Sequence, residues 1–393
     1  MTQKSVYITH AYRTPVGNLM GSLSAVSSVE LGSIVVKALL EQSKIDPNIV
    51  SELIMGQVLT GGLGQNPARQ TSIASGLPFP VPAFTVGKVC GSGLKAIALA
   101  YESILSGNNE IVIAGGQESM SNAMHASYIR KAVKAGDTKL IDMMMYDGLT
   151  DVFSGKAMGI TAENIASRFN ITREMQDQFS LDSQLKAAKA QNAGRFDHEI
   201  VPVKIISKKE EIIVLKDEFI KPDTKIETLA KLRSAFIDNG TVTAGNSSGI
   251  NDGAAAVIVA SEEAMIKHNL KPIARIVSYA TAGVNPDIMG TGPVPSTKMV
   301  TAKAGWAIGD IDLFEINEAF AAQAAYVIKE LAIDPNKVNV NGGAIAIGHP
   351  IGASGGRIIV TLLHEMIKTQ AKKSIASLCI GGGMGISLAL EGV

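Results

Sequence analysis

The feature that most constrains the fold is an order of predicted elements that occurs twice. In each half, a helix, a short strand, a helix, a short strand, a glycine-rich elbow, a helix and a strand ending in two glycines follow one another. The segment 90–116 thus parallels the segment 354–382 at nearly the same length. Alternating strands and helices predict mixed, largely parallel sheets with helices on both faces. The sequence therefore indicates an α/β fold of two similar halves, which could pack about a pseudo-twofold axis.

Hydrophobic spacing and turn residues locate the individual elements. Apolar residues at helical spacing predict a helix over 28–43, capped by Ser27 or Ser28 with Glu30 in its first turn. The other predicted helices are 94–105, 162–168, 173–193, 296–306, 317–331 and 357–369. The other predicted strands are 5–9, 54–58, 84–89, 110–114, 254–260, 313–316, 338–341, 374–378 and 384–390.

A long segment between the halves does not follow the repeated order, and we interpret it as an insertion. Its methionine run, 143–145, has two interpretations: the lining of a substrate pocket or, more commonly, a core or oligomer contact. We expect three parts in the chain: a first half of residues 1–118 and 249–270, an inserted loop domain of residues 119–248, and a second half of residues 271–393.

Composition excludes several classes of protein. The 36 basic residues balance the 36 acidic ones, so nothing favours a nucleic-acid or membrane surface as the main partner. The chain has only two cysteines, Cys90 and Cys379, too few for a secreted disulfide scaffold, although one disulfide between them stays open. No signal core, transit helix or membrane-spanning stretch is evident, so we expect a cytoplasmic protein.

The segment around Cys90 predicts a strand, a tight elbow and a buried helix, with the cysteine where the helix begins. The unpaired N–H groups of a helix start stabilise a thiolate, and a lowered thiol pKa is what a nucleophilic cysteine needs. A buried core thiol beside a glycine-rich turn is an equally good interpretation of this segment alone, because free cysteines are often simply core residues.

Three further polar residues stand at corresponding elbows of the second half. His349 lies between Gly348 and Pro350, Cys379 ends an apolar strand before three glycines, and Asn317 stands between a strand and a helix. These elbows should meet at the carboxyl ends of the strands, where open α/β sheets bind ligands. Helix capping is the rival interpretation for Asn317.

Two thiols and an imidazole in such positions indicate covalent acyl chemistry. One thiolate would be the nucleophile, His349 would activate it, and the second thiol would act as acid or base. Backbone N–H groups near Cys90 and Gly381 would form an oxyanion hole. The residues lack the spacing of a zinc site, and no phosphate-binding loop of the Walker type is present.

Together, these motifs resemble the thiolase family over nearly the whole chain, and among its subgroups the biosynthetic acetyl-CoA acetyltransferases. The resemblance implies a layered α/β/α/β/α core of two βαβαβαββ halves with an inserted loop domain. The segments that carry it are Val89 to Ala96, Asn317 to Phe320, Gly342 to Gly355, Cys379 to Gly383, Gln65 to Gln70 and Gly245 to Gly253.

The resemblance also implies a role for each residue. Cys90 would carry the acetyl group, His349 would activate Cys90, Asn317 would position a water, and Cys379 would move a proton at the methyl carbon of the second acetyl-CoA. The Cys90 and Gly381 N–H groups would hold the acyl oxygen. The residues implied near CoA are Ser248, Lys221, Met158, Ala244, Ala319 and Phe320. A turn or solvated-surface role is nearly as good for Ser248 and Lys221.

The implied reaction joins two acetyl-CoA molecules into acetoacetyl-CoA and CoA, or runs in reverse. CoA is a substrate, so no cofactor and no metal are expected. The implied assembly is a homotetramer, a dimer of dimers whose contacts the inserted domain supplies along with CoA binding.

Two positions depart from the family pattern. Gly87 replaces the usual Asn, and Ala157 replaces a pocket histidine in Lys156-Ala157-Met158-Gly159. The smaller, apolar Ala157 leaves open a 3-ketoacyl-CoA thiolase of broader chain length. A catalytically inactive acyl-CoA-binding relative and a ketoacyl synthase are weaker alternatives, because the polar set is complete and the last motif offers a cysteine.

Overall fold

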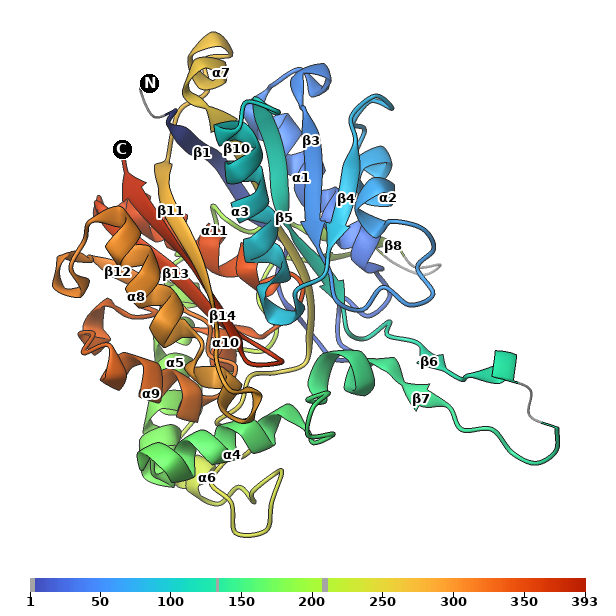
Figure 1. Cartoon of the computed structure of the whole chain (residues 1–393), viewed down its shortest axis with the longest axis vertical. Coiled ribbons are helices and arrows are strands. Elements are labelled where there is room, and N and C mark those ends of the chain that lie inside the picture. The colour runs from blue at the N-terminus through green and yellow to red at the C-terminus, as the bar shows by residue number, and fades with distance from the viewer. Residues whose placement is uncertain (1–3, 132–133, 207–210) are drawn as a thin grey trace.

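The protein is described by a computed structural model that covers residues 4–131, 134–206 and 211–393. Its centre is a ten-stranded sheet in the order β12-β13-β14-β11-β1-β10-β5-β3-β4, with β2 paired to β10 (Figure 1). The strands are β1 (Val6–Arg13), β2 (Gly17–Asn18), β3 (Glu52–Gly56), β4 (Ala83–Val86), β5 (Ile111–Ser119), β10 (Asn251–Ser261), β11 (Ala274–Gly283), β12 (Leu313–Ile316), β13 (Lys373–Ile380) and β14 (Met384–Gly392).

The helices pack on both faces of this sheet or lie below it (Figure 1). They are α1 (Ser28–Ser43), α2 (Pro67–Ala74), α3 (Ser92–Leu105), α4 (Met158–Phe169), α5 (Arg173–Asn192), α6 (Ile226–Ala230), α7 (Glu262–Lys267), α8 (Pro293–Ala304), α9 (Ala321–Glu330), α10 (Ala344–Ile347) and α11 (Ser354–Thr369). Within the described ranges, no helix is both long and apolar enough to cross a membrane.

The predicted duplication is visible in the strand pairing. In the first half β3 runs parallel to β5, which is followed by antiparallel β10 and β1. In the second half β12 runs parallel to β13, which is followed by antiparallel β14 and β11. Strands β1 and β11 pair with each other and join the halves. The predicted duplicated α/β fold is thus confirmed.

Three apolar clusters define the layers. One cluster lies between the halves and contains α3 and α11 with residues of both sets of strands. A second packs α1 on the outer face of the first half, and a third packs α8 and α9 on the outer face of the second. The order of layers is therefore helix, sheet, helix, sheet, helix, with α3 and α11 in the middle (Figure 1).

Glycines let α3 and α11 approach closely where both helices begin. A Cβ atom on Gly355 would lie 2.1 Å from the Leu94 backbone nitrogen, and one on Gly93 would lie 2.9 Å from the Gly356 nitrogen. No larger residue fits between backbones at such distances. The start of α3, next to Cys90, and the start of α11, next to the His349 segment, are therefore adjacent.

Some sequence predictions need correction. The sheet is antiparallel through its centre, because β14 follows β13 through a tight glycine turn and such turns join antiparallel strands. The predicted strand 338–341 is reduced to a single bridge between Val338 and Phe314. The helix predicted from Asn317 begins at Ala321. By contrast, α1 has the predicted bounds, and Ser27 caps it with Glu30 in a reciprocal capping box.

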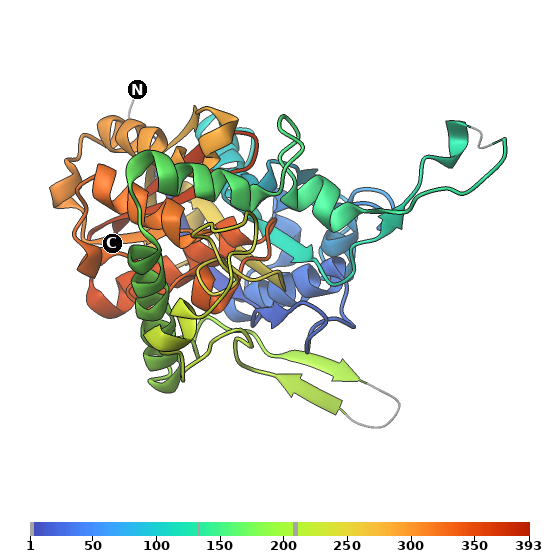
Figure 2. The same cartoon turned by 90° about the horizontal axis from the view of Figure 1, so that it is seen from below.

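The segment 119–248 holds α4, α5 and α6 below the core and two hairpins that extend from it. The first hairpin contains β6 (His125–Ala126) and β7 (Ile141–Asp142) and projects far from the rest of the chain (Figure 1). The second contains β8 (Val203–Ile206) and β9 (Glu211–Val214) and projects from another side (Figure 2).

A buried ion cluster fastens this segment to the first strand. The Arg13 guanidinium donates to Glu199 at 2.6 Å and, through two nitrogens, to Asp217 at 2.7 and 2.8 Å. All three side chains are buried. Because two carboxylates depend on one cation here, removal of the cation leaves uncompensated buried charge.

We therefore expect Arg13→Met to lower the free energy of unfolding by about 3–5 kcal/mol. The control is Arg275→Met, which breaks the half-exposed pair with Glu391 and should cost about 1 kcal/mol or less. Urea denaturation followed by circular dichroism measures both. Equal losses in the two variants would contradict the role assigned to the cluster.

Candidate active site

Cys90 lies in a strained elbow between β4 and α3. It occupies a short 3₁₀ turn, Val89–Gly91, and Val89 has a positive φ of 45°. A β-branched residue adopts this conformation only when its surroundings impose it. Ser92 does so, because its hydroxyl donates to the Val89 carbonyl at 2.7 Å and accepts the Lys88 N–H at 2.8 Å.

The Cys90 thiol is buried, and the nearby backbone N–H groups of Gly381 and of Cys90 itself act to lower its pKa. Burial nevertheless raises the pKa of Cys90 to about 11. The expectation that the helix start would lower this pKa is therefore wrong for the free site, since loss of hydration outweighs the two donors. The same two N–H groups are the pair expected to hold an acyl oxygen.

Cys379 lies near the end of β13, opposite Gly385 of β14, and is fully buried. Burial and, secondly, the charge of Cys90 raise its pKa, so the two sulfurs lie close enough to influence each other. Both are free thiols, so the disulfide left open by the sequence is absent. Met158 packs against the turn that follows, since a Cβ on Gly381 would lie 2.9 Å from its terminal methyl.

His349 is held by contacts that define its tautomer. The Ser354 hydroxyl donates to the Pro350 carbonyl at 2.9 Å, so its oxygen is free to accept from His349 Nδ1, 2.5 Å away. Nδ1 therefore carries the proton, and Nε2 keeps a lone pair for chemistry. Asn251 accepts the His349 backbone N–H at 2.9 Å and donates to the Gly17 carbonyl.

Asn317 faces this lone pair. Its Nδ2 lies 3.4 Å from His349 Nε2, and its buried Oδ1 has no hydrogen-bond partner among the described residues. Helix capping does not explain this residue, because α9 begins four residues later with Phe320 at its N-cap. An unpaired buried carbonyl oxygen is what a bound water would satisfy. Burial and then the charge of Arg357 lower the pKa of His349 to about 3, so the imidazole is neutral.

This group can therefore do covalent chemistry from an uncharged resting state. A neutral imidazole accepts a proton as a thiol attacks, and two N–H groups stabilise the oxyanion that forms. The second thiol, raised in pKa, is a weak acid whose anion is a strong base. Within the described ranges, no group of three or more His, Cys, Asp or Glu side chains could hold a metal ion.

A mostly apolar cavity of about 420 Å³ leads to His349. Of the residues expected near CoA, five line it: Ser248, Lys221, Met158, Ala244 and Phe320. Ala319 is not in the lining; its carbonyl accepts the Ser248 N–H at 3.0 Å. Met145 lines the cavity, so at least this member of the methionine run belongs to the pocket.

The two departures from the family pattern have different surroundings. Ala157 lines the cavity and pairs with Thr150 in an isolated bridge. Gly87 is exposed, and a Cβ there would meet nothing within 4 Å. Nothing in the structure explains the absence of a side chain at Gly87.

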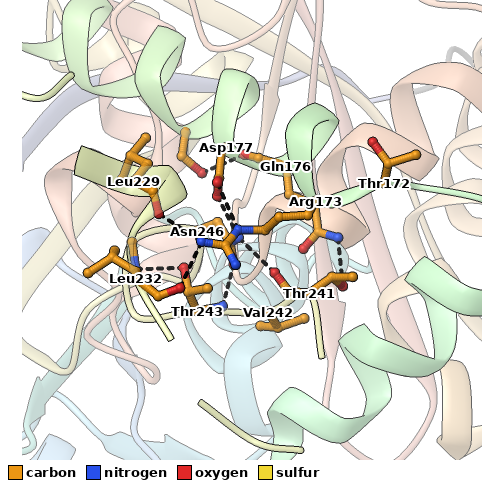
Figure 3. A network of polar contacts seen from close by, with 12 residues as sticks. Thr172, Arg173, Gln176, Asp177, Leu229, Leu232, Thr241, Val242, Thr243 and Asn246 are labelled. Atoms are coloured by element: carbon orange, nitrogen blue, oxygen red, sulfur yellow. Dashed lines mark hydrogen bonds and ion pairs between the residues drawn. The ribbon is translucent and has the colours of Figure 1, made fainter. Parts of the chain in front are cut away.

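A polar network joins Arg173, Asp177 and Asn246 (Figure 3), and Asn246 lies in the chain between the cavity residues Ala244 and Ser248. Arg173 donates to Asp177 at 2.7 Å and to the Leu229 carbonyl at 2.7 Å. Asn246 donates to Asp177 at 2.9 Å and accepts the N–H of Thr243 at 2.7 Å. Helix α5 and the segment after α6 are thus fixed to the residues that would contact a ligand.

Sequence reasoning missed Asn251 and Ser354 as supports of His349, and Met120 and Leu149 as cavity walls. Ser354 stood inside the glycine-rich segment, and its spacing of five residues from the histidine was the available signal. Asn251 is distant in sequence, and only the fold brings it to His349.

Comparison with known proteins gives the family of this chain. A thiol elbow, an imidazole and a second thiol on a duplicated α/β fold define an acyltransferase. Residues 6–263 match the family model for the thiolase N-terminal domain, and residues 270–392 match that for the C-terminal domain. The chain belongs to the thiolase family.

Individual relatives cover the whole length. The acetyl-CoA acetyltransferase of Paracoccus denitrificans is 56% identical over 384 residues, 98% of each chain. The cytosolic acetyl-CoA acetyltransferase of Mus musculus is 50% identical over 388 residues, again 98% of each. The crystal structure of the Bacillus anthracis acetyl-CoA acetyltransferase has a TM-score of 0.97 at 42% identity, covering 100% of this chain and 99% of that one. Human mitochondrial 3-ketoacyl-CoA thiolase has the same TM-score at 41% identity and covers 100% of both chains.

The tautomer argument predicts the effect of Ser354→Ala. Loss of the acceptor at Nδ1 lets the proton move to Nε2, so we expect alkylation of Cys90 by iodoacetamide to slow about tenfold, the size of one lost hydrogen bond. Mass spectrometry of the Cys90 peptide measures the rate. His349→Ala should slow it further, and adding Ser354→Ala to His349→Ala should change nothing more. Additive losses would refute an action of Ser354 through His349.

Proposed function

We propose that this protein is an acetyl-CoA C-acetyltransferase. It condenses two acetyl-CoA molecules to acetoacetyl-CoA and CoA and catalyses the reverse thiolysis, with a cysteine nucleophile. The observation that carries the proposal is that two groups border the same apolar cavity. Cys90, with Gly381 and Cys379 beside it, packs against the cavity residues Met120 and Ile351, and His349, paired with Asn317, lines the cavity itself. The names of the relatives at 50–56% identity support the choice of acetyl-CoA.

In the first half-reaction the Cys90 sulfur attacks the thioester carbonyl of acetyl-CoA. The Cys90 proton passes to His349 Nε2, and the N–H groups of Cys90 and Gly381 stabilise the oxyanion. The C–S bond to CoA then breaks, and CoA leaves as a thiol with the proton from His349. The product is acetyl-Cys90.

In the second half-reaction the Cys379 proton passes to His349 Nε2, and the Cys379 thiolate then removes a proton from the methyl group of another acetyl-CoA. The thioester oxygen of that molecule accepts hydrogen bonds from the protonated His349 Nε2 and from the water that Asn317 Oδ1 would bind, so developing negative charge is stabilised there. The new carbanion attacks the carbonyl of acetyl-Cys90. A C–C bond forms, the Cys90 C–S bond breaks, and the Cys90 sulfur takes the proton from His349 Nε2. Acetoacetyl-CoA is released, and Cys379 is a thiol again because it keeps the methyl proton.

The cavity supplies the proposed CoA contacts. Ser248, Ala244 and Phe320 lie along its wall. Lys221, whose ammonium stands 4.9 Å from the Phe219 ring centre, also lines it and would meet a nucleotide phosphate. Ala319 acts through the backbone bond to Ser248. The names of the acetyl-CoA acetyltransferase relatives do not favour either alternative, a 3-ketoacyl-CoA thiolase of broader chain length or an inactive acyl-CoA-binding protein. The broader chain length was left open because Ala157 places a small apolar side chain in the cavity wall.

We also propose a cytoplasmic homotetramer, a dimer of dimers, with the three-part division given above. The projecting hairpin β6–β7 supports it, since Tyr128, Ile129 and Leu140 are each more than 60% exposed on an arm far from the core (Figure 1). Exposed apolar side chains on such an arm are typical of a protein interface. The Mus musculus relative is named as cytosolic.

The two thiols should separate the half-reactions. Cys379→Ala should still release one equivalent of CoA from acetyl-CoA and acetylate Cys90, because only the second step needs the Cys379 base. Its acetoacetyl-CoA synthesis should fall at least 10³-fold, within the range of lost acid–base catalysis. Stopped-flow thiol detection and intact mass measure both, and Cys90→Ala is the control without a burst. A burst from Cys90→Ala, or full turnover of Cys379→Ala, would refute the proposal.

The assembly has its own test. Replacing Tyr128, Ile129 and Leu140 by serine should convert tetramers to dimers in light scattering, with activity per subunit largely kept. The matched control is Ile206→Ser on the other hairpin, also highly exposed, which should leave the tetramer unchanged. An unchanged mass in the triple variant would refute the role of this arm.

A further inference from the structure

A buried carboxylate outside the proposed reaction joins three segments around Cys90. Glu118 lies near the end of β5 and is fully buried. One carboxylate oxygen accepts the N–H of Val58 at 3.0 Å and that of Gly352 at 2.9 Å, and the other accepts the N–H of Leu59 at 3.2 Å. No Lys, Arg or His in the described ranges forms an ion pair with it.

The groups that Glu118 binds belong to the walls of the site. Leu59 and Ile351, the neighbour of Gly352, form one buried apolar cluster with Cys90. Gly352 also belongs to the turn after His349, in which the N–H of Ser354 donates to the Pro350 carbonyl at 2.9 Å.

The fit at Gly352 is tight. A Cβ atom there would lie 2.6 Å from the Glu118 carboxylate and 2.8 Å from the Gln57 backbone. On the other side, a Cβ on Gly116 would lie 2.2 Å from the Gly352 carbonyl oxygen. The Gly352 turn is therefore packed tightly against β5, and the Glu118 carboxylate is the polar group that binds it there.

An isolated carboxylate in such a place is costly, which argues for a role. Burial raises the pKa of Glu118 to about 7, against the lowering by its three N–H donors, and the nearby Asp252 adds to the rise. Removing an ion from water without a cationic partner costs several kcal/mol. Backbone N–H groups at loop ends also need acceptors, and a carboxylate can serve three at once.

We propose that Glu118 is a positioning residue that sets His349 and the Leu59 segment against Cys90. It touches no substrate atom; it acts by holding the Gly352 N–H, and through the Pro350–Ser354 turn it fixes the imidazole. The inference rests on the proposed function only where its test measures acetoacetyl-CoA thiolysis.

The test compares Glu118→Gln with a matched buried carboxylate. Glutamine keeps one acceptor oxygen, but its NH₂ group replaces the other oxygen and faces an N–H donor. The side chain can then no longer accept the N–H groups of Val58, Leu59 and Gly352 together. We expect kcat of acetoacetyl-CoA thiolysis to fall about 10- to 100-fold, the worth of one hydrogen bond to a charged acceptor, with KM for CoA changed less than threefold. The control is Glu163→Gln. Glu163 accepts the N–H groups of Thr241 and Val242, which belong to the network beside the CoA wall and not to the His349 turn. Its loss should therefore reduce stability and raise KM for CoA but keep kcat within twofold.

Two further variants cover the other outcomes. Gly352→Ala pushes the turn away from the Glu118 carboxylate without removing its charge, so it should also lower kcat. If Glu118→Gln does not fold, Gly352→Ala tests the proposal in its place. In a His349→Ala background, Glu118→Gln should not slow Cys90 alkylation further. Unchanged kcat in both Glu118→Gln and Gly352→Ala, equal losses in the Glu163→Gln control, or additive losses with His349→Ala would overturn the proposal. Alkylation of Cys90 needs no acyl-CoA, so it still tests Glu118 if wild type shows no thiolysis.

Discussion

The site depends on the backbone contact between the starts of α3 and α11. Because Gly93 and Gly355 have no side chains, the two helices meet at distances that exclude a Cβ atom. This contact places the Cys90 elbow of one half beside the His349 turn of the other. The charges of the site follow from the same packing: water is excluded, so both thiols and the imidazole are neutral at rest. The reactivity of Cys90 then comes from proton transfer to His349 during attack, and not from a thiolate already present in the free site.

Buried polar groups supply the precision that packing alone cannot give. Ser354 sets the tautomer of His349, Asn251 holds its backbone, and Glu118 binds the next turn. Each comes from a different element, so the imidazole is fixed by α11, β10 and β5 together. Such satisfied networks specify one arrangement where an apolar core would tolerate several.

The sequence predicted much of this fold because its signals are local. The capping box at Ser27, the helix bounds of α1 and the glycine-rich elbows are all written within a few residues. The errors arose where contacts between segments distant in the sequence determine the structure. The partners of β10 and β14 determine strand direction, and the contact with Asn251 is long-range. The thiol pKa at Cys90 was expected to fall, since a helix start is visible in sequence whereas the extent of desolvation is not. Sequence motifs predicted the roles of Cys90, His349 and Cys379. The residues that hold His349 in place were recognised only in the structure.

The place of the inserted segment has a consequence for how the chain folds. Strands β5 and β10 are neighbours in the sheet, yet Ser119 pairs with Asp252, so the whole insertion separates them. Pairing across such a separation is entropically costly and slow. During synthesis, β5 must wait until β10 has been made, with its apolar edge open in the meantime. The first half is therefore a unit that cannot complete its sheet before the inserted segment has been translated.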